Sequence, residues 1–98
     1  MISVFELDWD EDNRSYCEEK HGLTEEIADE VLCGEPEFFR NTPGLRASHV
    51  MIGPDERGTL WTIAILRVTT HRWRPITGYE SEHDDIELYR LARGRKHR

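Results

Sequence analysis

The sequence predicts an α+β fold, in which two amino-terminal helices and a carboxy-terminal helix pack against one face of an antiparallel β-sheet. Three observations support this fold class. Residues 59–68 form the most apolar run in the chain, and their β-branched and aromatic side chains are typical of a strand covered on both faces. A second extended segment, residues 72–79, follows after a few polar residues, so the two segments are expected to form a central β-hairpin. The apolar spacing is helical before residue 34 and extended after Glu37.

The first strand and the first helix are predicted at the amino terminus. Residues 2–7 alternate apolar and polar side chains, which indicates a short strand. Asp8 or Asp10 can then cap a helix that runs to about Lys20, and Gly22 permits the left-handed backbone that ends it. The side chains expected on the inner side of this helix are Trp9, Asn13, Tyr16 and Cys17.

The second helix is predicted to begin after Thr24, which can act as its N-cap, and to end at Gly34 and Pro36. Its apolar residues recur at helical spacing and its other side is acidic, so it is amphipathic. The inner stripe consists of Ile27, Ala28, Val31 and Leu32.

The remaining strands are predicted from short apolar segments separated by turn residues. Residues 38–40 and residues 46–52 are expected to be strands joined by a turn at residues 41–44. A second turn, residues 53–58, leads into the central hairpin. Because Pro75 cannot donate a hydrogen bond to a sheet, the last strand is expected to lie at an edge or to carry a bulge there.

The last helix is predicted to begin at residues 81–84, which have the spacing of a capping box. The basic tail, residues 93–98, is expected to be frayed. Residues 1–98 together have the length of a single domain. The inward positions of this helix are Ile86, Tyr89 and Ala92.

Charge is distributed unevenly along the chain, whose net charge is -7. Residues 1–37 contain thirteen Asp and Glu against only Arg14 and Lys20, whereas residues 38–98 contain eleven Arg and Lys against seven acids. Two explanations are open at this point. Either the two surfaces attract each other within the fold, or each serves a different partner.

The sequence indicates a cytoplasmic protein. It contains no apolar run as long as a membrane span, and acidic residues follow Met1 within a few positions, unlike in a secretory signal. Cys17 and Cys33 have no CxxC spacing, so two reduced thiols are expected. The histidines lack HxxxH and HxH spacing and no glycine-rich phosphate loop is present, so we expect neither a metal nor another cofactor.

Arginines in the predicted strands suggest a binding surface for phosphate. Residues two apart in a strand share a face, so Arg72 and Arg74 are expected to point the same way. Such a surface suits a phosphodiester, because the guanidinium donates a planar fork of hydrogen bonds to phosphate oxygens. The alternative is an edge strand protected from aggregation by its charges. The arginines placed in extended segments are Arg46, Arg67, Arg72 and Arg74.

Several short motifs resemble one known family. The amino-terminal part looks like the signature of the BrnT toxins, which belong to the RelE-like ribonuclease superfamily. The matching positions are residues 5–10, Asn13, residues 20–24, Ala28 and Val31. The later matches, spread over nearly the rest of the chain, are Arg46, Gly53, Gly58, Arg72, Arg74, Ile76, Thr77 and Tyr89.

The resemblance implies a messenger-RNA endonuclease that needs no metal and is held inactive by a cognate DNA-binding antitoxin. The reaction requires a base near the 2′-hydroxyl, a cation on the phosphate and a proton donor for the leaving oxygen. The residues that the resemblance assigns to this site are Lys20, His21, Arg46, Arg72 and Arg74.

Two positions depart from the pattern of that family. Tyr79 stands where the family has an arginine, and Asp85 stands where a glutamate usually precedes the closing tyrosine. Tyr79 carries no charge near pH 7, although it can still donate a proton or stack on a base. We therefore include Tyr79 among the candidate catalytic residues and expect an attenuated nuclease.

Three interpretations of function follow from the sequence. The first is a toxin-like, metal-independent mRNA endoribonuclease that forms a hetero-oligomer with its antitoxin. The second is a catalytically silent module of the same fold that binds a protein through its acidic helices or its basic sheet. The third is a small-molecule enzyme that uses His21 or His49 as a base.

Overall fold

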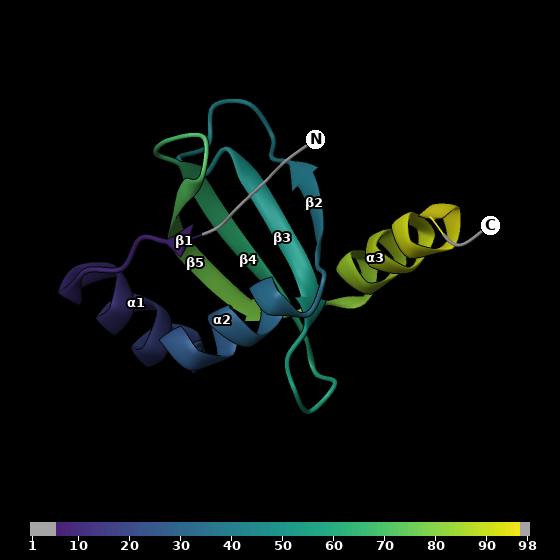
Figure 1. Cartoon of the computed structure of the whole chain (residues 1–98), viewed down its shortest axis with the longest axis horizontal. Helices are drawn as coiled ribbons and strands as arrows, with labels where there is room; N and C mark the ends of the chain where they lie inside the picture. The colour runs from purple at the N-terminus through teal and green to yellow at the C-terminus, as the bar shows by residue number, and fades with distance from the viewer. Residues whose placement is uncertain (1–5, 97–98) are drawn as a thin grey trace.

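The computed structural model describes residues 6–96, which form three helices and one five-stranded sheet (Figure 1). This composition is the predicted α+β class. Of the predicted first strand over residues 2–7, only residues 6 and 7 lie within the described residues, and both are extended. The elements are β1 (Glu6–Leu7), α1 (Glu11–His21), α2 (Glu25–Cys33), β2 (Glu37–Arg40), β3 (His49–Pro54), β4 (Leu60–Arg67), β5 (Arg72–Glu80) and α3 (His83–Lys96).

The strand order in the sheet is β1-β5-β4-β3-β2, so the apolar strand β4 lies in the middle, as predicted. Strands β2 to β5 are antiparallel to their neighbours, and β1 adds one short parallel pairing to β5. A bulge interrupts the β4–β5 ladder at Pro75, because Ala64 pairs with Thr77 whereas Ile65 pairs with Pro75. Of the two positions that the sequence allows for this proline, an edge or a bulge, the structure has the bulge.

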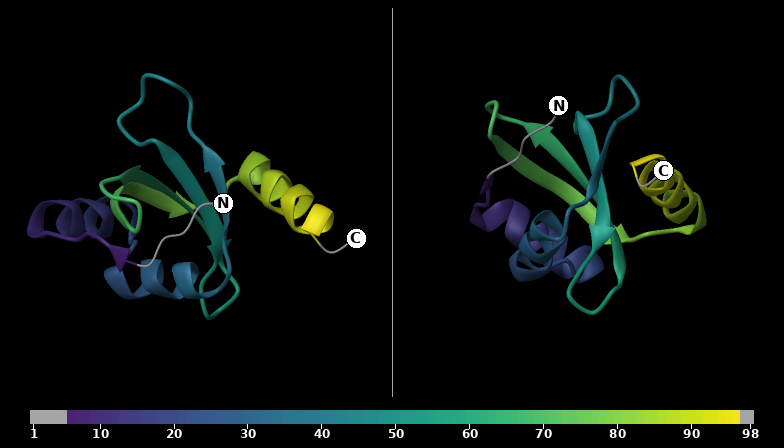
Figure 2. Two further views of the ribbon diagram at one scale, coloured as in Figure 1. Left: turned by 45° about the horizontal axis from the view of Figure 1, so that its top comes forward. Right: turned by 45° about the vertical axis from the view of Figure 1, so that its right-hand side comes forward.

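The core lies between the sheet and the two amino-terminal helices, which cover the same face of it (Figures 1 and 2). Trp61, Ile63 and Ile65 of β4 are buried on this face. On the opposite face of β4, Thr62 is buried, but Leu60, Ala64 and Leu66 are only half-buried. The strand is therefore fully covered on one face and partly covered on the other.

Helix α3 differs from its predicted position. Figure 2 shows it projecting beyond β2 instead of lying across the sheet with the other helices. It lacks a wide apolar stripe, and Leu88 and Leu91 are exposed, so little apolar area drives it onto the sheet. The helix continues through Lys96, so residues 93–96 of the predicted frayed tail are helical, and the last two residues lie outside the described part of the chain.

Helix α1 begins at a complete capping box. The Asp10 side chain accepts a hydrogen bond from the Asn13 amide at 3.0 Å, and the Asn13 side chain accepts one from the Asp10 amide at 2.7 Å. Gly22 ends the helix with a left-handed φ of 71°, as predicted. Asn13 and Cys17 point inward, but Tyr16, which was predicted to do so, is 47% exposed.

Two further local features position the site. β3 begins at His49 and not at residue 46, so Arg46 lies in the loop before the strand. Gly78 of β5 allows α1 and α2 to approach the sheet, because a Cβ atom there would lie 2.4 Å from the Cδ2 atom of buried Leu23.

Candidate functional site

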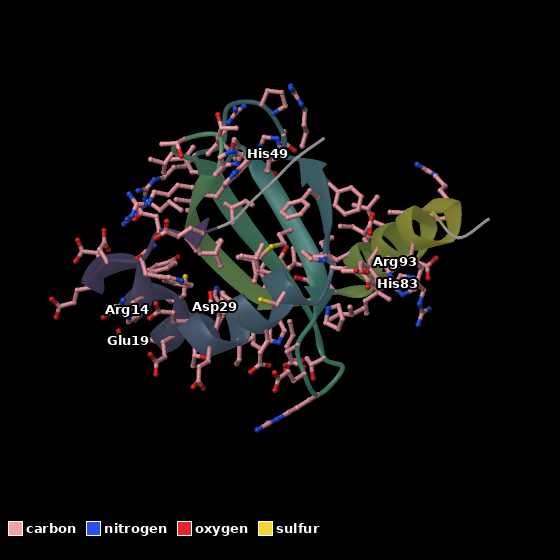
Figure 3. The ribbon with its side chains drawn as sticks, in the orientation of Figure 1. Arg14, Glu19, Asp29, His49, His83 and Arg93 are labelled. Carbon is pink, nitrogen blue, oxygen red and sulfur yellow. The ribbon has the colours of Figure 1, made fainter. Side chains whose placement is uncertain are left out.

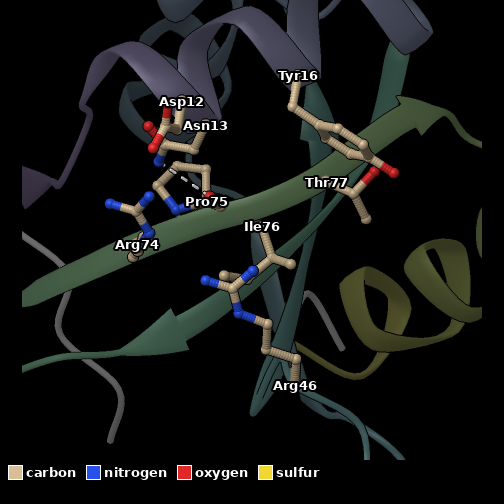
Figure 4. A pocket seen from close by; sticks show the side chains of 8 residues that line it. All are labelled: Asp12, Asn13, Tyr16, Arg46, Arg74, Pro75, Ile76 and Thr77. Atoms are coloured by element: carbon tan, nitrogen blue, oxygen red, sulfur yellow. Dashed lines mark hydrogen bonds between the residues drawn. The ribbon is translucent and has the colours of Figure 1, made fainter.

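A cavity of about 520 Å³ lies between α1, β5 and the loop that precedes β3 (Figure 4). Helix α1 contributes Asp12, Asn13 and Tyr16, β5 contributes residues 74–77, and the loop contributes Arg46. Two of the predicted site residues, Arg46 and Arg74, therefore meet in one pocket although they come from separate elements.

Asn13 fixes the relative position of the pocket walls. Its side-chain amide donates hydrogen bonds to the carbonyl oxygens of Asp8 and Pro75, each at 3.0 Å, and the bond to Pro75 is drawn in Figure 4. The residue is buried, and its bond to Pro75 is shielded from water. The first turn of α1 is thus tied directly to β5 at its bulge.

Arg74 is paired with an acid of the amino-terminal segment. Its Nη1 atom lies 2.6 Å from Oδ2 of Asp10, and only 20% of the Arg74 side chain is exposed. The hydrogen bond from Arg74, together with those of the helix cap, lowers the pKa of Asp10 to about 2, so the carboxylate is ionised at neutral pH. The positive charge of Arg74 is therefore compensated within the fold.

Arg72 is compensated in the same way. Its guanidinium lies 3.4 Å from the Glu6 carboxylate and 3.7 Å from that of Asp8. The acidic amino-terminal segment thus lies along the strand that carries the two arginines. This arrangement favours the first explanation of the charge distribution, in which the acidic and basic surfaces attract each other within the fold.

Arg46 is the exposed cation of the pocket. Its loop is closed by two hydrogen bonds of 3.0 Å, from the Asn41 amide to the Ser48 carbonyl and from the Asn41 side chain to the Ala47 carbonyl. Among the residues that the structure describes, no salt bridge involves Arg46. The prediction that Arg46 lies in a strand was wrong, but the loop brings it to the same pocket as Arg74.

The other predicted site residues lie at the far end of α1. The rings of His21 and Tyr79 are 6.1 Å apart in an edge-on arrangement, and Lys20 is exposed in the last turn of α1. Burial raises the pKa of Tyr79, and the nearby Asp85 and Glu82 raise it further, so its phenol remains protonated. The predicted set is thus divided: Arg46 and Arg74 share the pocket, His21 and Tyr79 lie together near Lys20, and Arg72 lies outside both, beside Glu6 and Asp8.

Sequence reasoning misplaced one pocket residue, Tyr16. Figure 4 shows the Tyr16 side chain extending from α1 toward Thr77 on β5. Helical spacing placed Tyr16 on the inner side with Asn13 and Cys17, but Tyr16 lies at the flank of this stripe, because a step of one residue turns the side chain by about 100° around the helix. Only the position of β5 relative to α1 shows that Tyr16 faces a pocket.

His49, the other histidine considered as a catalytic base, lies at the other end of the sheet from α3 (Figure 3). His49 packs edge-on against Trp73, with 4.7 Å between ring centroids, and its Nδ1 atom lies 2.9 Å from the Ser48 hydroxyl. Burial, together with the charges of Arg40 and Arg67, lowers the pKa of His49. A neutral imidazole in contact with an indole ring is simply explained as part of the packing.

The described part of the chain contains no group of three or more His, Cys, Asp and Glu side chains placed to hold a metal ion. Within the same residues, no helix combines the length and the apolar character needed to cross a membrane.

Comparisons with known proteins identify the fold. No protein-family model matches the sequence, and no curated protein matches it. Among solved structures, the crystal structure of the Brucella abortus ribonuclease toxin BrnT aligns with a TM-score of 0.63 and 17% sequence identity. The alignment covers 82% of this chain and 100% of that chain. The chain has a BrnT-like fold. The resemblance that the short sequence motifs indicated is therefore confirmed at the level of the BrnT-like fold.

Proposed function

We propose that this protein is a toxin-like, metal-independent endoribonuclease that acts on mRNA in the cytoplasm and is inhibited by a cognate antitoxin in a hetero-oligomer. The observation that supports the proposal most is the pocket in which Arg46 and Arg74 converge from two separate elements of a BrnT-like fold. Guanidinium groups suit this role because they keep their charge at cellular pH and match the geometry of phosphate oxygens.

The reaction that fits these residues uses the RNA itself as the nucleophile. The 2′-oxygen attacks the adjacent phosphorus, the bond to the 5′-oxygen breaks, and a 2′,3′-cyclic phosphate and a 5′-hydroxyl form. A base takes the proton of the 2′-hydroxyl and an acid donates one to the 5′-oxygen. His21 is the candidate base, and Tyr79, whose phenol stays protonated, is the candidate acid beside it. Because neither residue lines the Arg46–Arg74 pocket, the proposal places the scissile phosphate between this pair and Arg46.

The charges of the site indicate slow cleavage. Arg74 and Arg72 are compensated by acids, and Tyr79 stands where the related toxins have a cation. Stabilising the charge that develops on the phosphate is commonly the largest catalytic contribution. With fewer free cations, the rate is expected to be about a hundredfold or more below that of a fully charged site.

The test is cleavage of a labelled single-stranded RNA by the purified protein in the presence of a chelator. Arg46→Ala is expected to slow cleavage about tenfold or more, because Arg46 is the uncompensated cation of the pocket. Arg57→Ala is the matched control, since Arg57 is exposed in the turn after β3 and the variant has the same net charge. Equal rates for the two variants would contradict the proposal.

The pairing of both β5 arginines with acids favours a second candidate, a catalytically silent module that binds a protein. Expression of the chain alone separates the two functions. Growth arrest with mRNA decay, abolished by Arg46→Ala, supports the nuclease. Absence of both effects, together with binding of a small protein encoded by a neighbouring gene, supports the silent module.

A further inference from the structure

We propose that Tyr16 is a base-stacking platform, and that the pocket between α1 and β5 binds one nucleotide of single-stranded RNA, with its phosphodiester on Arg46. The inference rests on the proposed function and specifies its substrate as an unpaired nucleotide within a strand. Such a nucleotide offers both a charged phosphate and an accessible base face.

The first argument is the exposure of Tyr16. The residue is 47% exposed, although its neighbour Cys17 is completely buried. Its ring extends along the pocket wall toward Thr77, from the opposite side to the guanidinium groups of Arg46 and Arg74 (Figure 4). An aromatic face on one side of a cavity and cations on the other are the two components of a single-stranded nucleic-acid site.

The second argument is the size and stiffness of the pocket. Its volume of about 520 Å³ falls within the range, roughly 300–1,000 Å³, of small-molecule sites. The buried side chain of Asn13 holds the helix that carries Tyr16 against β5 through its bond to Pro75. The distance between the tyrosine and the arginines is therefore set before RNA binds, which reduces the entropy cost of binding.

The third argument concerns which kind of phosphate fits. Arg46 is exposed, Arg74 is neutralised by Asp10, and Asp12 adds a negative charge to the pocket wall. A phosphodiester carries one negative charge, whereas a terminal phosphate carries about 1.5 to 2 near pH 7. A pocket lining of little net charge, in which Arg46 is outside any salt bridge of the described residues, therefore suits an internal nucleotide better than a free mononucleotide.

The experiment measures binding of a labelled octanucleotide of 2′-O-methyl RNA, which binds but lacks the nucleophilic hydroxyl. Tyr16→Ala is expected to weaken binding about tenfold, whereas Tyr16→Phe, which keeps the aromatic face, restores most of the affinity. Leu88→Ala on α3 is the control, because Leu88 is exposed to a similar degree (43%) and lies away from the pocket. Thermal unfolding of each variant confirms that the fold is intact.

A second series replaces single nucleotides of the octamer by abasic residues. One abasic position is expected to weaken binding to the unaltered protein, and the same replacement is expected to have little effect on Tyr16→Ala. Adenosine monophosphate should compete poorly with the octamer. This coupling between one base and one tyrosine would not arise if Tyr16 only supported the fold.

The outcomes separate this inference from the proposed function. One outcome is that the octamer binds and Arg46→Ala weakens this binding, while both Tyr16→Ala and the abasic series leave the affinity unchanged. The proposal for Tyr16 is then wrong, and the phosphate site at Arg46 stands. If the unaltered protein does not bind the octamer, both proposals are overturned.

Discussion

The Asp10 carboxylate lies 2.6 Å from the Arg74 guanidinium and, at the same time, caps helix α1. One side chain therefore both starts the helix and neutralises a cation of the candidate site. The residues are 64 positions apart in sequence, and their contact joins the acidic amino-terminal segment to the strand that carries the arginines.

Asp10→Asn separates these two roles, because asparagine is an equally good N-cap but carries no charge. We expect the variant to remain folded and to bind RNA more tightly, because Arg74 becomes available to phosphate. Its RNA affinity should also fall more steeply with salt concentration, by about one additional counterion. Binding measured over a series of salt concentrations checks this. Glu19→Gln on the exposed side of α1 makes the same change in net charge, so an equal gain in that variant would contradict the prediction.

Tyr79→Arg is expected to raise RNA cleavage about tenfold or more in the presence of a chelator, because it adds a cation where phosphate charge develops. Asp85 and Glu82 lie close enough to Tyr79 to raise its pKa, so they also stabilise an arginine there. Arg74→Ala in the same assay is expected to lower the rate. If the unaltered protein is fully active and Arg74→Ala is no slower, the arginine mechanism is wrong.

Gly78→Ala is expected to destabilise the protein by about 1–3 kcal/mol, because the added Cβ would lie 2.4 Å from a methyl group of Leu23 in the packed core. Gly94→Ala is the matched control. Nothing lies within 4 Å of a Cβ at Gly94, and alanine favours the helix there by about 0.5–1 kcal/mol. Urea unfolding should show that the free energy of unfolding falls for Gly78→Ala and rises for Gly94→Ala. Equal changes in the two variants would argue against the close approach at Gly78.

Stability is expected to fall as the pH is lowered through the range in which His49 titrates. Burial, Arg40 and Arg67 lower the pKa of His49 from 6.5, so below that pH the unfolded chain binds a proton more readily than the folded one. The free energy of unfolding should therefore be lower at about pH 5.5 than at about pH 7.5. His49→Gln should reduce the difference, and a titration by NMR that places the pKa of His49 above 6.5 would contradict the prediction.

Local signals predicted much of this fold. The apolar run predicted β4. Gly22 predicted the end of the first helix, and Thr24 and Gly34 predicted both limits of the second, because caps and turns depend on neighbours a few positions away. The position of α3 was not predicted. Its apolar residues do not form a stripe wide enough to show which surface it covers.

The site was predicted less completely, because its geometry depends on contacts between distant segments. The sequence identified Arg74 as a candidate but gave no sign that Asp10 would pair with it. It likewise identified Tyr16 as helical but placed it in the core. A side chain at the flank of a helix can be assigned only when the neighbouring strand is known.

The parallel pairing of β1 with β5 also affects when the pocket can form during synthesis. Glu6 pairs with Arg72, and the pocket walls combine α1 with residues 74–77. Strand β1 therefore cannot pair in the sheet until β5 has been synthesised and has left the ribosome. Contacts between such distant segments form late in folding. A nascent chain that still lacks β5 therefore has no pocket, so under the proposed function it does not bind the messenger RNA from which it is being translated.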